Sequence, residues 1–158
     1  MSTDPAPIHH LQGAITCVTV PAQLRYLEIV RPAVRIAMDG YGADPACATD
    51  IGLAVDELAS VLIACAGSAG ELQVAVAQDP TDVHIELTIA DVATRSEPNL
   101  DALSRQLLEA TTAAHSARRA DRTLTGRLRR RLTDHACRSA ACRDVGAHPG
   151  SGCPSGHR

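Results

Sequence analysis

The sequence of 158 residues contains no phenylalanine, no tryptophan and no lysine, and its only aromatic side chains are Tyr26 and Tyr41. A chain of this length is long enough for one domain with a two-layer core, and 45% of its residues are apolar. That core must be built from alanine, valine, leucine and isoleucine. Because aromatic side chains that could stack on bases are almost absent, we expect no direct contact with nucleic acid.

Long apolar runs are also missing. No stretch approaches the roughly 18 consecutive apolar residues that span a membrane. The first seven residues, MSTDPAP, lack the positive charge and the apolar segment of a secretory signal. We therefore expect a cytoplasmic protein without membrane contact, in which the six cysteines are mostly reduced. Cys17, Cys47 and Cys65 lie in apolar stretches and are expected to be buried.

The net charge of −3 hides an uneven distribution. Residues 1–115 hold 5 arginines and 15 acidic residues, a balance of −10, whereas residues 116–158 hold 10 arginines and 3 aspartates, a balance of +7. We expect residues 1–13 to be a flexible arm and residues 116–158 to be a mostly disordered tail, because neither shows a regular apolar spacing. The arginine run at residues 127–131 is interpreted as a solvated charged segment, and binding to nucleic acid or to an acidic partner is the alternative.

The tail also carries histidines and cysteines that could bind zinc: His135, Cys137, Cys142, His148, Cys153 and His157. Their spacing does not match a standard zinc finger closely, and chance composition is the competing explanation. The abrupt change in composition also permits a shifted reading frame, which peptide mapping by mass spectrometry would detect.

The apolar spacing before the tail predicts its first elements. Residues 14–20 are rich in β-branched side chains and predict a strand. Residues 23–38 have a helical spacing, although Pro32 should kink this helix or split it. Asp44 and Pro45 then provide the cap and first residue of a long helix, which the glycines after residue 66 end.

A hairpin and a third helix follow. Apolar residues alternate in segments 71–78 and 83–89, which predicts two antiparallel strands with one buried and one solvated face. A polar loop at residues 90–99 precedes a helix from Leu100 to about Ala114. The order β-α-α-β-β-loop-α predicts an α+β fold, a two-layer sandwich whose mostly antiparallel sheet is covered on one face by helices.

The long helix carries the sequence DIGLAVDELASVLIACA at residues 50–66, between the first helix and the hairpin. Its LAVDE segment, residues 53–57, resembles the N-box helix of the histidine-kinase-like (GHKL) ATPase superfamily. Within that superfamily it is most similar to the anti-sigma-factor serine kinases of the RsbW type. The order of elements around the helix also matches, so that the resemblance covers about residues 14–115.

The resemblance implies an ATP site on this helix. In the family, a glutamate acts as general base toward the attacking hydroxyl, and an asparagine four residues later binds Mg²⁺. Glu57 stands at the first position. Val61 stands at the second, and because its side chain has no oxygen, we do not expect a normal Mg²⁺ site here.

A second motif of the family is an aspartate, followed by glycines, that contacts the adenine. Asp91 stands at this place, at the end of a predicted strand, but residues 92–95 read VATR and contain no glycine. The resemblance therefore implies a retained adenine contact without the close approach of the backbone. The family's closing strands and glycine-bearing phosphate lid have no evident counterpart, since only Gly126 lies among the arginines.

The function implied by the resemblance is that of an anti-sigma factor, usually a homodimer, which sequesters an alternative sigma factor. An anti-anti-sigma factor competes with the sigma factor for this domain, and family members phosphorylate the anti-anti-sigma factor. Because the ATP motifs are incomplete, we expect sigma binding with weak or absent phosphorylation. Two alternatives are an active serine/threonine-protein kinase, and an inactive truncated paralogue whose sheet lacks its closing strands.

Overall fold

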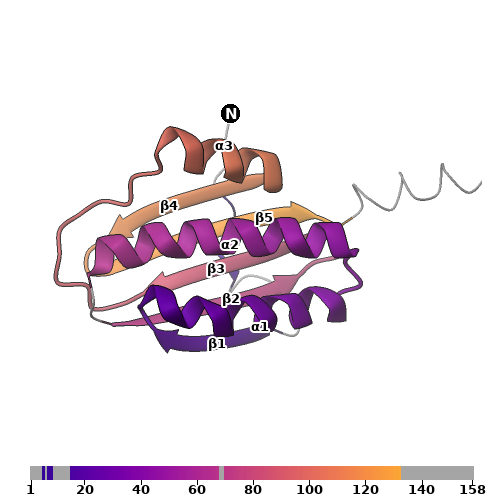
Figure 1. Cartoon of the computed structure of the whole chain (residues 1–158), viewed down its shortest axis with the longest axis horizontal. Coiled ribbons are helices and arrows are strands. Elements are labelled where there is room, and N and C mark those ends of the chain that lie inside the picture. The colour runs from indigo at the N-terminus through magenta and orange to yellow at the C-terminus, as the bar shows by residue number, and fades with distance from the viewer. Residues whose placement is uncertain (1–4, 6, 9–14, 68–69, 133–158) are drawn as a thin grey trace, which may run out of the picture.

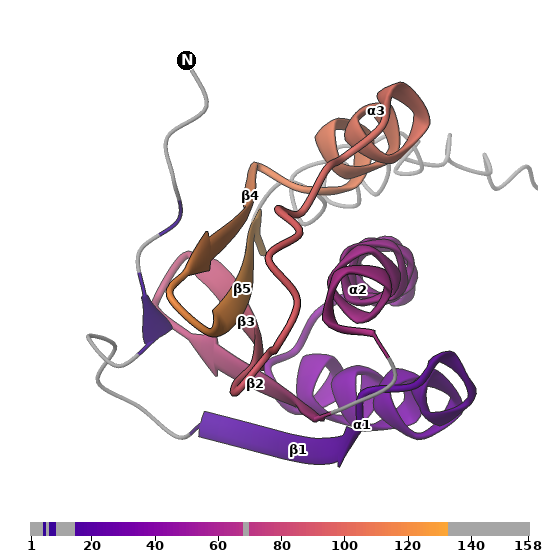
Figure 2. The same ribbon diagram turned by 90° about the vertical axis from the view of Figure 1, so that its left-hand side faces the viewer.

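The computed structural model describes residues 5, 7, 8, 15–67 and 70–132. These residues form one five-stranded sheet in the order β1-β2-β3-β5-β4, in which every neighbouring pair is antiparallel. Helices α1, α2 and α3 all lie on one face of this sheet (Figure 1, Figure 2). The predicted α+β two-layer sandwich is confirmed. The face turned away from the helices is called the outer face below.

The first elements are β1 (Ile15–Pro21), a short 3₁₀ turn (Leu24–Tyr26) and α1 (Leu27–Gly40). Pro32 lies inside α1, which continues through it rather than splitting into two helices. Pro32 is exposed, so that water can satisfy the carbonyl group that loses its amide partner. The opposite side of α1 enters the core through Leu27, Val30, Val34, Ala37 and Met38.

Helix α2 (Pro45–Ala66) lies across the middle of the sheet (Figure 1). As predicted, Asp44 caps it by accepting a hydrogen bond from the backbone N–H of Cys47, at 2.9 Å, and Pro45 begins it. Gly67, with a φ of 71°, ends it. Ten residues of α2 are buried, and they form the apolar side through which the helix packs in the core.

The predicted hairpin is formed by β2 (Glu71–Gln78) and β3 (Asp82–Ile89). Its inner face is buried, but the expectation of a solvated outer face is wrong at His84, which is only 6% exposed. Pro5 and Ile8 are buried too. Part of the segment that we expected to be a free arm therefore packs on the protein.

The chain after the hairpin departs most from expectation. Helix α3 (Ala102–Thr111) is shorter than predicted. It is followed by two strands, β4 (Ala114–Ala120) and β5 (Thr123–Arg131), in a region that we expected to be a structureless tail after residue 115. Strand β5 lies between β3 and β4 and completes the sheet. The proposed zinc ligands at residues 135–157 lie outside the described residues.

The arginines of this region neutralise carboxylates from the acidic part of the chain. Arg127 of β5 pairs with Glu86 of β3 at 2.7 Å, and both side chains are nearly buried. Arg130 of β5 reaches Asp50 of α2 at 3.1 Å. The uneven charge distribution in the sequence thus reflects two complementary parts of one domain rather than a domain and a separate tail.

Two of the three cysteines that we expected to be buried are not. Cys47 is buried, but Cys65 is partly exposed and Cys17, on the outer side of the edge strand β1, is exposed. Leu103 is 73% exposed, because α3 packs through Leu108 instead. None of the helices formed by the described residues has the length and apolar character needed to cross a membrane.

Candidate functional site

Glu57, the candidate general base, lies in the middle of α2 and is partly buried. Its carboxylate accepts a hydrogen bond from the hydroxyl of Ser104 in the first turn of α3. Ser104 is only 6% exposed. Asp101 caps α3 by accepting the backbone N–H of Ser104 at 2.8 Å, and this bond, first among several, lowers the pKa of Asp101. The cap and the Glu57 contact therefore fix the beginning of α3 against α2.

Val61 lies one turn further along α2 and is half-buried. Its polar neighbours in the sequence are engaged elsewhere, since Asp56 pairs with Arg31 of α1 and the Ser60 hydroxyl donates to the Asp56 carbonyl group at 2.7 Å. Mg²⁺ requires oxygen ligands; Val61 has none, and the Asp56 carboxylate pairs with α1. Val61 does not fit the Mg²⁺ site that the resemblance implies.

Asp91, the candidate adenine contact, follows β3 in a left-handed conformation with a φ of 58°. Its side chain is 90% exposed and lies 3.9 Å from Arg122. It lines a cavity of about 400 Å³ together with residues of β1, β2 and β3 and their flanking loops: Thr19, Gly70, Glu71, Gln73, Thr88 and Ala90. None of these lies on α2, so the cavity lined by Asp91 does not include Glu57.

Residues 90–101, called the linker below, join β3 to α3. They contact the end of α2 on one side and the β4–β5 turn on the other. On one side, the Thr94 hydroxyl donates to the Cys65 carbonyl group near the end of α2. On the other, the backbone N–H of Val92 donates to the Arg122 carbonyl group, at 2.8 Å, in the β4–β5 turn. Figure 2 shows this segment passing from the end of β3 toward α3. Val92 is 3% exposed and belongs to the core.

The linker and α3 together follow α2 from Cys65 to Glu57, eight residues or about 12 Å along the helix axis. The side of α2 that carries Glu57 is therefore contacted by the chain's own residues. Ser104 was missed at the level of sequence, although Asp101 three residues before it is a recognisable helix cap. Its contact with Glu57 could not be foreseen, because the two residues lie 47 positions apart.

The β4–β5 turn and the linker enclose a second cavity, of about 680 Å³, which the sequence did not predict. Three arginines line it, Arg95, Arg119 and Arg122, together with Glu97 and Asp121. Two of these guanidinium groups already donate to carbonyl groups, Arg119 to Ser96 and Arg122 to Asp91. Arg119 and Arg122 therefore help to hold the linker in place.

The strand order and the order of elements define an α+β sandwich in which three helices cover one face of a five-stranded antiparallel sheet. No protein-family model and no curated protein matches the chain. Among solved structures, the fold is similar to the crystal structure of the RsbU and RsbW domains of Rv1364c from Mycobacterium tuberculosis, with a TM-score of 0.61 and 21% sequence identity. The match covers 76% of this chain and 33% of the chain in that structure, so it spans about a third of the latter. At this identity, the likeness is one of fold.

Proposed function

We propose that this chain is an anti-sigma factor that binds an alternative sigma factor and withholds it from RNA polymerase, without efficient phosphoryl transfer. Two observations support the proposal. The LAVDE segment at residues 53–57 resembles the N-box of the RsbW-type family, and the five-stranded sandwich is similar to a solved structure that contains an RsbW domain. Binding requires a folded surface, and the described residues form a five-stranded sheet covered by helices.

The observation that favours binding over catalysis is the contact between Glu57 and Ser104. A general base must reach the hydroxyl of the substrate, and here the carboxylate already accepts a hydrogen bond from within the domain. Val61 removes the metal ligand expected one turn away. Both features lower the expected rate of phosphoryl transfer, and neither alters the exposed surface of the domain.

Nucleotide binding is a separate part of the proposal. We infer that any ATP binding depends on Asp91 rather than on Mg²⁺, because Asp91 is accessible and Val61 cannot bind a metal. Calorimetric titrations with ATP in the presence and absence of magnesium separate the two contributions. In the family, such domains act as homodimers, and an anti-anti-sigma factor competes with the sigma factor for them. We include a second copy of the chain and an anti-anti-sigma factor in the proposal.

An active serine/threonine-protein kinase is the second candidate, and the retention of Glu57 on α2 favours it. It predicts magnesium-dependent phosphorylation of an anti-anti-sigma factor that is lost in Glu57→Ala. The truncated paralogue is less well supported, because its premise, a sheet without closing strands, is not met once β4 and β5 are in place.

The test is to recover partners of the tagged full-length chain from its own host. We expect an alternative sigma factor to co-purify and no phosphate transfer from Mg-ATP to the cognate antagonist. Glu57→Gln is the matched variant, because glutamine can still accept the Ser104 hydrogen bond but cannot act as a base. The Glu57→Gln variant should recover the sigma factor to the same extent as the natural chain does. Recovery of no sigma factor refutes the proposal, and phosphate transfer that Glu57→Gln abolishes supports the kinase instead.

A further inference from the structure

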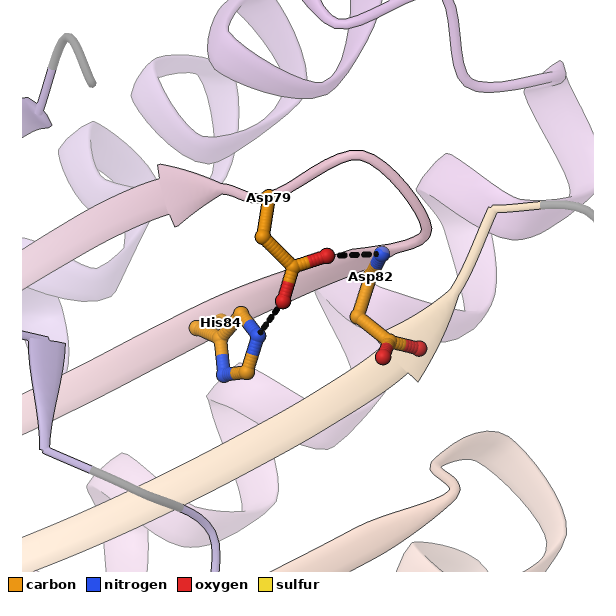
Figure 3. A group of neighbouring side chains, drawn as sticks. All are labelled: Asp79, Asp82 and His84. Atoms are coloured by element: carbon orange, nitrogen blue, oxygen red, sulfur yellow. Dashed lines mark hydrogen bonds and ion pairs between the residues drawn. The ribbon is translucent and has the colours of Figure 1, made fainter. Parts of the chain in front are cut away.

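The turn of the β2–β3 hairpin gathers three side chains that can bind a metal ion: Asp79, Asp82 and His84 (Figure 3). One ligand atom from each lies within 4.8 Å of the others. This turn is at the opposite end of β3 from Asp91, on a different part of the domain from the candidate nucleotide residues. The cluster is therefore independent of the proposed function.

The first two ligands have a separation that suits a metal ion. His84 Nε2 lies 2.9 Å from Asp79 Oδ2. Two ligands that are each about 2.1 Å from a metal are about 3.0 Å apart at a right angle and about 3.4 Å apart at the tetrahedral angle that zinc prefers. The other oxygen of Asp79 accepts the backbone N–H groups of Thr81 and Asp82, at 2.9 and 2.8 Å, which fix the carboxylate in the turn. An ion could replace the proton between His84 and Asp79 with little movement of either side chain.

Two atoms of the cluster have no partner in the part of the chain that the structure describes. The His84 side chain is 7% exposed and directs Nε2 into the cluster, and its Nδ1 has no hydrogen-bond partner. Asp82 Oδ1 is likewise buried and without a partner. Buried polar atoms are nearly always paired, because leaving a polar atom unpaired costs free energy. The turn alone explains the orientation of Asp79, but it does not explain a buried carboxylate oxygen of Asp82 beside a buried imidazole.

We propose that Asp79, Asp82 and His84 bind a divalent transition-metal ion of the zinc class. One imidazole nitrogen and two carboxylate oxygens favour Zn²⁺, Co²⁺ or Mn²⁺ over Mg²⁺ and Ca²⁺, which prefer oxygen ligands alone. Three protein ligands leave at least one coordination position for water. Binding would connect the two strands of the hairpin at its turn and stabilise the folded chain in proportion to the occupancy of the site.

The test is a calorimetric titration of the full-length chain with zinc under reducing conditions. Because cysteines in the tail could also bind zinc, every protein in the comparison carries Cys137→Ser, Cys142→Ser and Cys153→Ser. Asp82→Asn keeps the backbone N–H that Asp79 accepts and removes only the charged ligand. His84→Gln removes the imidazole, and His115→Gln, on β4, is the matched control for loss of a histidine.

We expect the background protein and His115→Gln to bind zinc equally. Asp82→Asn should weaken the Kd by at least about tenfold, and His84→Gln should abolish this site. Zinc should also raise the Tm of the background protein but not that of Asp82→Asn, which keeps the test valid if His84→Gln folds poorly. The proposal is overturned if the background protein binds no zinc, or if Asp82→Asn binds it with the same affinity and stoichiometry.

Discussion

Ser104 of α3 donates its hydroxyl hydrogen bond to the Glu57 carboxylate of α2, across the contact between the two helices. The residue that the sequence marks as a candidate base is thus a partner of the first turn of α3. This contact makes α3 and the linker part of the environment of Glu57. It also provides a direct way to ask whether Glu57 is structural, functional or both.

Replacing Ser104 with alanine should lower the free energy of unfolding by about 1–2 kcal/mol, because a partly buried carboxylate loses its donor. Urea denaturation of the full-length chain measures this change. Glu57→Gln should cost less, since an amide oxygen can still accept the bond. In a double-mutant cycle with Glu57→Ala, strictly additive effects of the two alanine substitutions would show that the contact does not form in solution.

Gly126 of β5 lies directly beneath α2, and a Cβ at this position would be 2.7 Å from Leu58 Cδ2. Gly126→Ala should therefore destabilise the protein by about 1–3 kcal/mol through overpacking. Gly52→Ala is the matched control, because a Cβ there has no neighbour within 4 Å and alanine favours the helix by about 1 kcal/mol. A Gly126→Ala variant as stable as the natural chain would contradict the packing of β5 against α2.

The ion pair between Arg127 and Glu86 is almost fully buried, with side chains 9% and 13% exposed. Glu86→Leu or Arg127→Met alone should cost about 3 kcal/mol or more, because each leaves a buried charge without its partner. The double variant should be closer in stability to the natural chain than either single one. Thermal denaturation of the natural chain, the two single variants and the double variant measures these differences. If the double variant is destabilised by the sum of the two single effects, this would argue against a β3–β5 pairing in this register.

Asp79 should make the stability of the protein sensitive to acid. Partial burial alone would raise its pKa, but hydrogen bonds from Thr81, His84 and Asp82 together lower the pKa from 3.8 to about 2. The Asp79 carboxylate therefore becomes protonated at a higher pH in the unfolded chain than in the folded chain. The stabilisation is complete above about pH 4 and is lost as the pH falls toward about 2.

Urea denaturation between pH 6 and pH 2 checks this dependence, with Asp79→Asn as the comparison. The difference in unfolding free energy between the natural chain and Asp79→Asn should shrink as the pH falls through that interval. A difference that stays constant would mean that the Asp79 carboxylate is not hydrogen-bonded in the folded protein.

Much of the first half of the fold could be predicted from local signals. The cap at Asp44, the apolar side of α2 and the alternation in β2 and β3 depend on residues close to one another in the chain. The two closing strands could not be recognised in the same way. In β5, Leu124, Gly126 and Leu128 do alternate toward the helices, but the intervening arginines hide the pattern.

Two of the β5 arginines, Arg127 and Arg130, are neutralised by carboxylates that lie far away in the sequence. Glu86 lies 41 residues from Arg127 and Asp50 lies 80 residues from Arg130, so no local rule could indicate either pair. The same limit applies to the candidate site. The sequence identified Glu57 and Val61 on one helix, but the contact with Ser104 and the exposure of Asp91 follow from the way in which the linker packs.

The proposal that the domain binds a sigma factor without acting as a kinase is tested most directly by titration calorimetry. The full-length chain is titrated with each sigma factor of its own host, with and without Mg-ATP. We predict that one alternative sigma factor binds and that Mg-ATP leaves its Kd unchanged, because Val61 cannot supply the metal ligand. Failure of every sigma factor to bind, or binding that requires Mg-ATP, would contradict the account.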